Sequence, residues 1–355
     1  MVKIKIAIAG VGNCASNFVQ GIEYYKKDLN NSIGLVHRRL GKYDITDIEF
    51  VAAFDISKTK VGEDLSDAIF KYPNNTKIVS PVPKLNVIVE KGPVLDGWNE
   101  KFADFFEISD SPASNVEGIL RKTKADILVI LLPTGSDKAC EYYVEAALNA
   151  GVSVVNGTPT FLSANNLIME KVRSSKVSYI GDDFKSQIGG TIFHHTLLNL
   201  LKLRGIAVDS SYHLNYAGNM DFLNLMSNRG SKKHISKANG IKATGNEHVD
   251  LSVNVTYLEN QKDNKTCRVY IEGKNFAGCP VILEGKLTVV DSANSSGVLV
   301  DAIRCAKIAS DNGIYGYLDT PSSCFMKSPR YQLEEQEAYS KLNKFIEENT
   351  VLKNR

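Results

Sequence analysis

The stretch "IKIAIAGVGNCAS", residues 4 to 16, determines the fold that we expect for this chain. Its apolar first half predicts a buried strand, and a helix follows directly after a glycine-rich turn. The turn matches G-x-G-x-x-A: Gly10 makes the tight turn, Gly12 lets a pyrophosphate approach the backbone, and Ala15 keeps helix and strand close. The helix start can hold phosphates, so the stretch predicts a dinucleotide site. A strand-to-helix turn needs a glycine in any case, so a purely structural turn remains the alternative.

Asp55 favours the dinucleotide interpretation, because it ends the next apolar run, "IEFVAAFD" (48 to 55). A carboxylate there can accept both hydroxyls of an adenine ribose and disfavours a 2′-phosphate, which predicts NAD rather than NADP. Asp55 comes later along the chain than is usual for this motif. The extra length is the polar segment "YYKKDLNNSIGLVHRRLGKYDITD" (24 to 47), which we interpret as an insertion that forms a surface loop.

Further apolar runs occupy 125 to 133, 152 to 158 and 177 to 183, with helical patterns between them. Near-continuous apolar strands that alternate with helices are typical of a parallel sheet covered on both faces. The sequence therefore predicts an α/β fold with a Rossmann-type doubly wound parallel sheet. One crossover helix has Ser136 as its expected N-cap and Gly151 just past its end.

The pattern changes after residue 200. Alternating apolar and polar residues predict strands at 210 to 218, 266 to 276 and 280 to 292, which suit a mixed or antiparallel sheet. An amphipathic helix at 295 to 313 could return to the first sheet, and a terminal helix follows at 333 to 349. We therefore expect an NAD-binding Rossmann domain at 1–190, a catalytic and oligomerisation α+β domain at 191–295, and a C-terminal helical segment at 296–355 that returns to the first domain. Short stretches such as "NNTK" (74 to 77) are expected to be polar turns.

The composition is that of a globular protein, with 43% hydrophobic and 23% charged residues in 355. A net charge of +2 gives no reason to expect nucleic acid or a membrane as partner. The six cysteines form no C-x-x-C pair, so neither a zinc site nor a disulfide framework is indicated. No apolar run approaches about 18 residues, and the N-terminus does not read as a signal peptide, so we expect a cytoplasmic protein.

Polar residues follow the later strands of the predicted parallel sheet. Thr134, Ser136, Asn156 and Thr158 lie where loops at the carboxyl ends of strands line a ligand crevice, so they are placed to face the nicotinamide half of a cofactor. Ser136 can equally serve as the cap of its helix. The next such loop contains Lys185, which could stabilise a developing oxyanion; a solvated surface position is the alternative.

Other polar clusters leave two interpretations open. Asn219, after Gly218, could belong to a backbone nest for phosphate or cap a helix. Lys233 and Lys237 would share a helix face, where an anion could separate their like charges, although solvated positions explain them too. His194 and His195 are adjacent and do not share a helix face, so we expect a buried histidine rather than a metal pair.

A set of sequence blocks resembles one enzyme family in the order in which they occur. They are "GVGNCASNFVQGIEYY", "IEFVAAFD", "GPVLDG", "LLPTGSDKA", "GDDFKSQIG", "GNMDFLNL", "ISK", "DNKT", "DSANSSG" and "FMKSP". The chain resembles the short prokaryotic form of inositol-phosphate synthase over essentially its whole length. The resemblance implies cyclisation of glucose 6-phosphate to myo-inositol 3-phosphate with a bound, recycled NAD. Oxidation at C5, loss of a C6 proton, closure onto C1 and re-reduction would leave no net redox change.

The resemblance also implies roles for particular residues. Its active-site lysines and aspartate fall on Lys185, Lys233, Lys237, Asp263, Lys265 and Lys327. It places the cofactor at Gly10, Gly12, Asn13, Cys14, Ala15, Asp55, Pro133, Thr134, Gly135, Ser136, Asn156, Thr158, Asp183 and Asp263. Phosphate or substrate contacts are expected from Ser186, Gln187, Asn219, Met220 and Asp221.

The chain departs from the family pattern at "QIGGT" (187 to 191), where larger eukaryotic members have a second lysine. Three alternatives to the implied activity stay open: a cyclase of the same mechanism for another sugar phosphate, an ordinary NAD-dependent dehydrogenase, and a non-catalytic NAD-binding regulator. The family implies a homotetramer that acts on a small sugar phosphate, and it leaves an assisting metal or other cation unknown.

Overall fold

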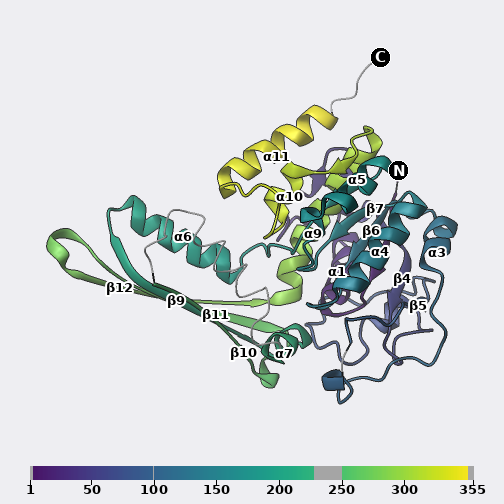
Figure 1. Cartoon of the computed structure of the whole chain (residues 1–355), viewed down its shortest axis with the longest axis horizontal. Helices are drawn as coiled ribbons and strands as arrows, with labels where there is room; N and C mark the ends of the chain where they lie inside the picture. The colour runs from purple at the N-terminus through teal and green to yellow at the C-terminus, as the bar shows by residue number, and fades with distance from the viewer. Residues whose placement is uncertain (1–2, 99, 228–249, 351–355) are drawn as a thin grey trace. The chain divides into compact units, whose positions relative to one another are not determined.

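The computed structural model describes residues 3–98, 100–227 and 250–350. The chain forms two compact units: unit 1 comprises Met1–Lys185 and Ser295–Arg355, and unit 2 comprises Ser186–Asn294 (Figure 1). The C-terminal segment therefore belongs to the same unit as the N-terminal part of the chain. Among the helices of the described ranges, none combines the length and apolar character needed to cross a membrane.

Unit 1 contains a seven-stranded parallel sheet in the order β13-β8-β7-β6-β1-β4-β5. The strand order reverses around β1, as in a doubly wound fold, so the predicted fold class is confirmed. The strands are β1 (Ile4–Ala9), β4 (Ile48–Asp55), β5 (Val89–Lys91), β6 (Ile127–Ile130), β7 (Ser153–Asn156), β8 (Ser178–Ile180) and β13 (Gly316–Tyr317).

Eight α-helices accompany this sheet in the described residues. They are α1 (Asn13–Lys26), α2 (Leu65–Ala68), α3 (Val116–Thr123), α4 (Asp137–Ala150), α5 (Asn166–Ser174), α9 (Asp291–Asp311), α10 (Asp319–Phe325) and α11 (Glu335–Thr350). The expected C-terminal helices at 295 to 313 and 333 to 349 correspond to α9 and α11, and α9 is buried around almost its whole surface rather than amphipathic as the sequence suggests.

The sheet of unit 1 is buried on both faces. Successive side chains of a strand point to opposite sides, so one strand contributes to the apolar clusters on both faces. Ile4, Ile6 and Ile8 of β1 pack in one apolar cluster with residues of α1 and α9. Ala7 and Ala9 of the same strand belong to a second cluster, with residues of α3, α4 and α5. The near-continuous apolar run of β1 thus packs against the helices on both faces of the sheet.

The segment 24 to 47 is not the surface loop that the sequence suggests. Its second half forms the antiparallel pair β2 (Arg39–Leu40) and β3 (Tyr43–Asp44), followed by a short 3₁₀ turn. Leu40, Tyr43 and Ile45 are at most 1% exposed and belong to the same apolar cluster as β1. The interpretation was wrong because three apolar side chains at spacings of two and three residues are enough to anchor an otherwise polar segment.

Arg304 of α9 anchors the segment 24 to 47 to the core. Its guanidinium is fully buried and donates to the carbonyl oxygens of His37 at 2.6 Å and Arg38 at 2.8 Å. It also pairs with the carboxylate of Asp301 on the same helix. Asp301 in turn lies 2.7 Å from Nδ1 of His37. A buried charge needs such partners, and these connect the insertion to the C-terminal part of the chain.

Unit 2 contains a four-stranded mixed sheet in the order β10-β9-β11-β12 (Figure 1). β10 pairs with β9 in parallel, whereas the other two pairings are antiparallel. Leu198 and Leu201 of α6 pack on this sheet against Cys267, Val269 and Ile271. The elements are α6 (Gly190–Leu203), β9 (Ala207–Ala217), α7 (Met220–Ser227), β10 (Asp250–Tyr257), β11 (Asn264–Lys274) and β12 (Pro280–Val290).

His194 on α6 is the buried histidine that the sequence predicts. Its Nδ1 lies 3.0 Å from Nδ1 of His213, and its Nε2 lies 2.5 Å from the hydroxyl of Ser211. Burial lowers the pKa of His194 from 6.5 to about 4, so the imidazole is neutral at neutral pH.

Replacing Arg304 with methionine tests the anchoring of the insertion. We expect Arg304→Met to lower the free energy of unfolding by about 3–5 kcal/mol, because Asp301 and several carbonyl groups lose a buried partner. Urea denaturation followed by circular dichroism measures the change. Lys344→Met is the matched control, since Lys344 is exposed and pairs loosely with Glu348 at 3.7 Å. Equal unfolding free energies for the two variants would contradict the anchoring role.

Candidate functional site

The glycine-rich turn lies between β1 and α1, as the sequence predicts. Gly10 has φ +96°, and a Cβ there would lie 2.6 Å from the carbonyl oxygen of Leu131, so a side chain is excluded by conformation and by space. Gly12 is the N-cap of α1 and provides no side-chain cap. A Cβ on Gly12 would meet nothing within 4 Å. The start of α1 therefore keeps the features that a pyrophosphate needs.

Asp55 ends β4, the strand that pairs with β1. Its Oδ2 accepts a hydrogen bond from the backbone N–H of Val11 at 2.8 Å, within the glycine-rich turn. Its Oδ1 accepts from the N–H groups of Ile56 and Ser57, both at 2.8 Å. The carboxylate is thus fixed beside the turn, where an adenine ribose would place its hydroxyls.

Lys60 is a buried residue of this site that the sequence analysis missed. Its ammonium donates to the carbonyl of Val11 at 2.8 Å and to Oδ1 of Asn74 at 2.9 Å. Lys60 is only 3% exposed, and burial lowers its pKa. Asn74 also donates to the carbonyls of Val11 at 3.1 Å and Ile69 at 2.9 Å. A lysine and an amide together hold the backbone between Gly10 and Gly12.

The stretch 74 to 77 is therefore more than the polar turn that its composition suggests. Asn75 exchanges two hydrogen bonds with the side chain of Asn13, at 2.8 and 2.9 Å, at the start of α1. Thr76 accepts a hydrogen bond from Asn17, one turn further along α1. Local sequence gives no signal for these contacts, because about 60 residues separate the partners.

Loops after β6 and β7 bring further predicted residues to the same edge of the sheet. Ser136 occupies the N-cap position of α4, but its hydroxyl donates to the carbonyl of Pro133 at 2.7 Å. The capping carboxylate is that of Asp96, which accepts from the N–H groups of Lys138 at 2.7 Å and Ala139 at 3.1 Å. Asp96 lies in the "GPVLDG" block, whose role the sequence alone does not reveal.

Asn156 is fully buried and makes four hydrogen bonds within the protein. Its Nδ2 donates to Asp182 at 2.8 Å and to the carbonyl of Thr160 at 3.1 Å, and its Oδ1 accepts from the N–H and hydroxyl of Thr158. Asp182 accepts further bonds from the Tyr179 hydroxyl at 2.5 Å and the Ser163 N–H at 2.9 Å. Burial raises the pKa of Asp182 to about 6. This network fixes the loops after β7 and β8.

The loop after β8 brings together three predicted residues from distant parts of the sequence. Lys327 donates to Oδ1 of Asp183 at 2.9 Å. The second carboxylate oxygen of Asp183 is buried without a hydrogen-bond partner among the described residues. Lys185 lies two residues further along the loop, and its side chain is 8% exposed. Two cations and an acceptor that can take another donor are thus placed at the carboxyl edge of the sheet.

A second polar cluster lies in unit 2, at the end of β9 and the start of β11. Asp263 is 2% exposed and accepts from Nδ2 of Asn219 at 3.0 Å and from the hydroxyl of Ser292 at 3.1 Å. Asn219 caps α7 by accepting from the N–H of Phe222 at 3.1 Å, as one of the two interpretations proposes. Lys265 pairs with Asp291 at 3.0 Å.

Four further predicted residues lie in unit 2. Met220 and Asp221 form the first turn of α7, and the backbone N–H of Gln187, beside Ser186, donates to the carbonyl of Asn294 at 3.0 Å. Lys233 and Lys237 lie outside the described residues. In the described part of the chain, no three His, Cys, Asp or Glu side chains are grouped as metal ligands would be.

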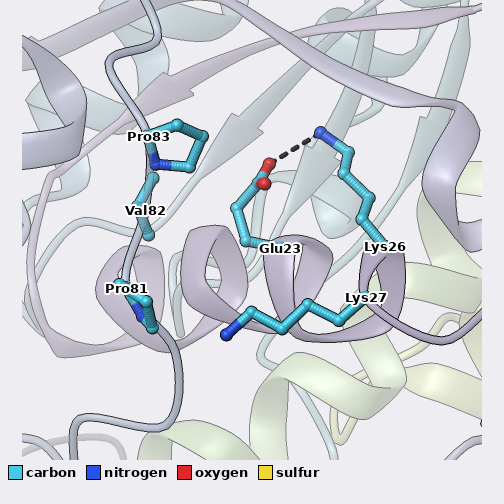
Figure 2. A pocket seen from close by; sticks show the side chains of 6 residues that line it. All are labelled: Glu23, Lys26, Lys27, Pro81, Val82 and Pro83. Carbon is cyan, nitrogen blue, oxygen red and sulfur yellow. Dashed lines mark hydrogen bonds and ion pairs between the residues drawn. The ribbon is translucent and has the colours of Figure 1, made fainter.

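One open pocket of unit 1 is separate from these residues. It is lined by Glu23, Lys26 and Lys27 at the end of α1 and by the segment 81 to 83. Figure 2 shows the carboxylate of Glu23 turned toward the ammonium of Lys26, and the two are 2.6 Å apart. None of the predicted site residues lines it, so we do not assign it to the candidate site.

Comparison with known proteins gives a consistent result. The family model for myo-inositol-1-phosphate synthase matches residues 189–292. The inositol-3-phosphate synthase of Mycolicibacterium smegmatis is 42% identical over 359 residues, which cover 97% of this chain and 98% of the relative. That of Mycobacterium tuberculosis is 43% identical over 354 residues, with 97% and 96% covered.

Solved structures share the fold of this chain over nearly its whole length. The crystal structure of Ari2 has a TM-score of 0.81 at 35% identity and covers 97% of this chain and 99% of its own. Inositol-3-phosphate synthase from Caenorhabditis elegans has a TM-score of 0.76 at 18% identity, with 99% and 86% covered, which shows a shared fold. With identities above 40% over nearly the full length, this chain belongs to the myo-inositol-1-phosphate synthase family.

Proposed function

We propose that this chain is an NAD-dependent inositol-3-phosphate synthase, which converts D-glucose 6-phosphate to 1D-myo-inositol 3-phosphate. The observation that carries the proposal is that the loop with Asp183 and Lys185 pairs with the segment that contains Lys327, in the unit that also contains the glycine-rich turn and Asp55. Family membership indicates which reaction the chain catalyses. The ammonium groups of Lys185 and Lys327 would provide the positive charges that this reaction needs. We further propose, from the family resemblance, a cytoplasmic homotetramer.

The residues around the glycine-rich turn fit NAD. The uncapped start of α1 suits a pyrophosphate, and the fixed carboxylate of Asp55 suits a ribose with two free hydroxyls. A 2′-phosphate would meet the negative charge of Asp55, so we propose NAD rather than NADP. Gly10, Gly12 and Asp55 would hold NAD, and the bound cofactor would supply a hydride acceptor and donor for C5 of the sugar, with no net redox change.

The lysines are proposed to stabilise the charge that develops on the sugar between the two hydride transfers. Loss of the C6 proton forms an enolate, and closure of C6 onto the C1 aldehyde forms an alkoxide. Fixed ammonium groups in a site shielded from water can stabilise such oxygens by several kcal/mol. In unit 1 we assign this role to Lys185 and Lys327, each of which is held in an ion pair.

Other proposed roles follow the family resemblance. Lys233, Lys237, Asp263 and Lys265 complete the proposed catalytic set. Ser186, Gln187, Asn219, Met220 and Asp221 are proposed to contact the substrate or its phosphate. Asn13, Cys14, Ala15, Pro133, Thr134, Gly135, Ser136, Asn156, Thr158, Asp183 and Asp263 are proposed to line the cofactor site with Gly10, Gly12 and Asp55.

Carbon NMR with glucose 6-phosphate labelled at C6 tests the function directly. With NAD far below the substrate concentration, we expect the labelled CH₂ to become a ring CH over many turnovers per NAD. Absorbance at the NADH band should show no lasting increase, because the hydride returns to the product. NADH that rises in step with an oxidised open-chain or lactone product would instead mean an ordinary dehydrogenase.

Lys185→Met tests the proposed charge stabilisation. We expect kcat to fall at least about 100-fold, as when one donor to a developing oxyanion is lost, while NAD affinity is retained. Steady-state assays and an NAD titration measure the two effects. Lys171→Met is the control, because Lys171 is exposed and pairs with Glu145 on the surface. Full turnover by Lys185→Met would refute a catalytic role for Lys185.

Lys60→Met tests whether Lys60 maintains the glycine-rich turn. Loss of a charged donor to the Val11 carbonyl should raise the Kd for NAD about tenfold or more, because such bonds contribute about 1.5–3 kcal/mol. Calorimetric titration with NAD measures this without any need for turnover. The matched control is Lys58→Met, since Lys58 is two residues away and pairs with Glu107 and Asp110 in solvent. An unchanged Kd in Lys60→Met would remove Lys60 from the site.

A further inference from the structure

Lys185 is held by contacts that extend beyond the loop on which it lies. Its ammonium donates to Oε1 of Glu335 at 2.8 Å and to the carbonyl of Ser323 at 2.9 Å. Its backbone N–H donates to the carbonyl of Phe325 at 2.8 Å. These partners are more than 130 residues away along the chain, so the position of the lysine depends on how the C-terminal segment returns to unit 1.

Glu335 has a fixed position because it begins α11, and this helix is anchored in the core. Ala338 and Leu342 of α11 are fully buried in the apolar cluster that contains β1. A lysine near a helix N-terminus is unfavourable, and a glutamate in the first turn offsets this. The start of α11 therefore suits a carboxylate that faces an ammonium.

Of the titratable groups close to this pair, two carry no charge at neutral pH and two carboxylates are paired elsewhere. Burial raises the pKa of the Cys324 thiol to about 12 and also raises the pKa of Tyr339. Asp183, two residues before Lys185, pairs with Lys327. Asp301, further away, pairs with Arg304. Glu335 is thus the carboxylate in direct contact with Lys185.

The contacts also leave the ammonium able to act on a ligand. A lysine ammonium has three N–H donors, and Glu335 and Ser323 take two of them. In the proposed function the third would donate to an oxygen of the sugar, in a direction that the first two restrict. Lys185 can then meet the substrate as a fixed, charged donor rather than as a mobile side chain.

We propose that Glu335 is a positioning residue for Lys185, which aims the ammonium at the reacting sugar. This inference rests on the proposed function, in which Lys185 stabilises the enolate and alkoxide oxygens. Glu335 itself need not touch substrate or cofactor. The simpler alternative is a surface ion pair without consequence, since the Glu335 side chain is 37% exposed.

Glu335→Gln separates the two possibilities, with Glu337→Gln as its matched control. Glu337 lies in the same first turn of α11 but pairs with Lys341 on the surface, at 2.8 Å. We expect Glu335→Gln to lower kcat about 10- to 100-fold, with KM and the Kd for NAD nearly unchanged, because a mispositioned group loses mainly transition-state stabilisation. Glu335→Asp, which keeps the charge, should recover part of the loss. Equal kcat in the two glutamine variants would overturn the proposal.

A second measurement does not depend on turnover. Trace acetylation with acetic anhydride, followed by mass spectrometry of peptides, compares Lys185 and Lys327 in the same sample. We expect Glu335→Gln to speed labelling of Lys185 several-fold, because the amine loses the 2.8 Å contact with the carboxylate that holds it, and to leave the labelling of Lys327 unchanged. An unchanged labelling rate for Lys185 would overturn the proposal. Absence of cyclisation by the parent enzyme would refute the proposed function, and the labelling result would still decide the role of Glu335.

Discussion

The ion pair between Lys327 and Asp183 joins segments 144 residues apart, and the candidate site of unit 1 depends on it. Around it, the backbone N–H groups of Lys327 and Ser328 donate to the carbonyls of Asp183 and Asp182. The C-terminal segment is thereby fixed to the loop that follows β8. Without the return of the C-terminal segment to unit 1, Lys327 would not lie beside the loop that contains Lys185. This loop would also lack the carbonyl groups of Ser323 and Phe325, which accept hydrogen bonds from Lys185.

Three lysines of the proposed catalytic set that the structure describes, two in unit 1 and one in unit 2, have carboxylate partners before any substrate binds. Lys327 pairs with Asp183, Lys185 with Glu335, and Lys265 with Asp291. An unpaired ammonium would be costly to bury, so each pair keeps a cation in place at low free-energy cost. A phosphorylated sugar can then use donors that are already oriented, which is the condition under which electrostatic stabilisation contributes most to a reaction rate.

The proposed cofactor half of the site is likewise held by contacts within the protein, from the amide of Asn74, the buried ammonium of Lys60 and the carboxylate of Asp55. Lys60 and Asn74 bind the Val11 carbonyl on one side of the turn, and Asp55 binds the Val11 N–H on the other. The backbone of Val11 is therefore held from two directions. Family membership is shared with relatives at identities above 40%, and these contacts give a physical reason for the shape of the turn in this chain.

The sequence by itself determined the parallel sheet, the glycine-rich turn and Asp55, because each depends on local periodicity or on a conformation that few residues adopt. It also predicted a buried histidine at 194 or 195 and singled out Lys185. Resemblance to the family added Lys327 and Asp183, but neither the pairing of these two residues nor the pairing of Lys185 with Glu335. Tertiary structure alone decided that part of 24 to 47 enters the core, that Asp96 caps α4, and that Lys60 and Glu335 support the site. These are contacts between distant residues, and no local pattern records which distant side chain will complete a buried charge.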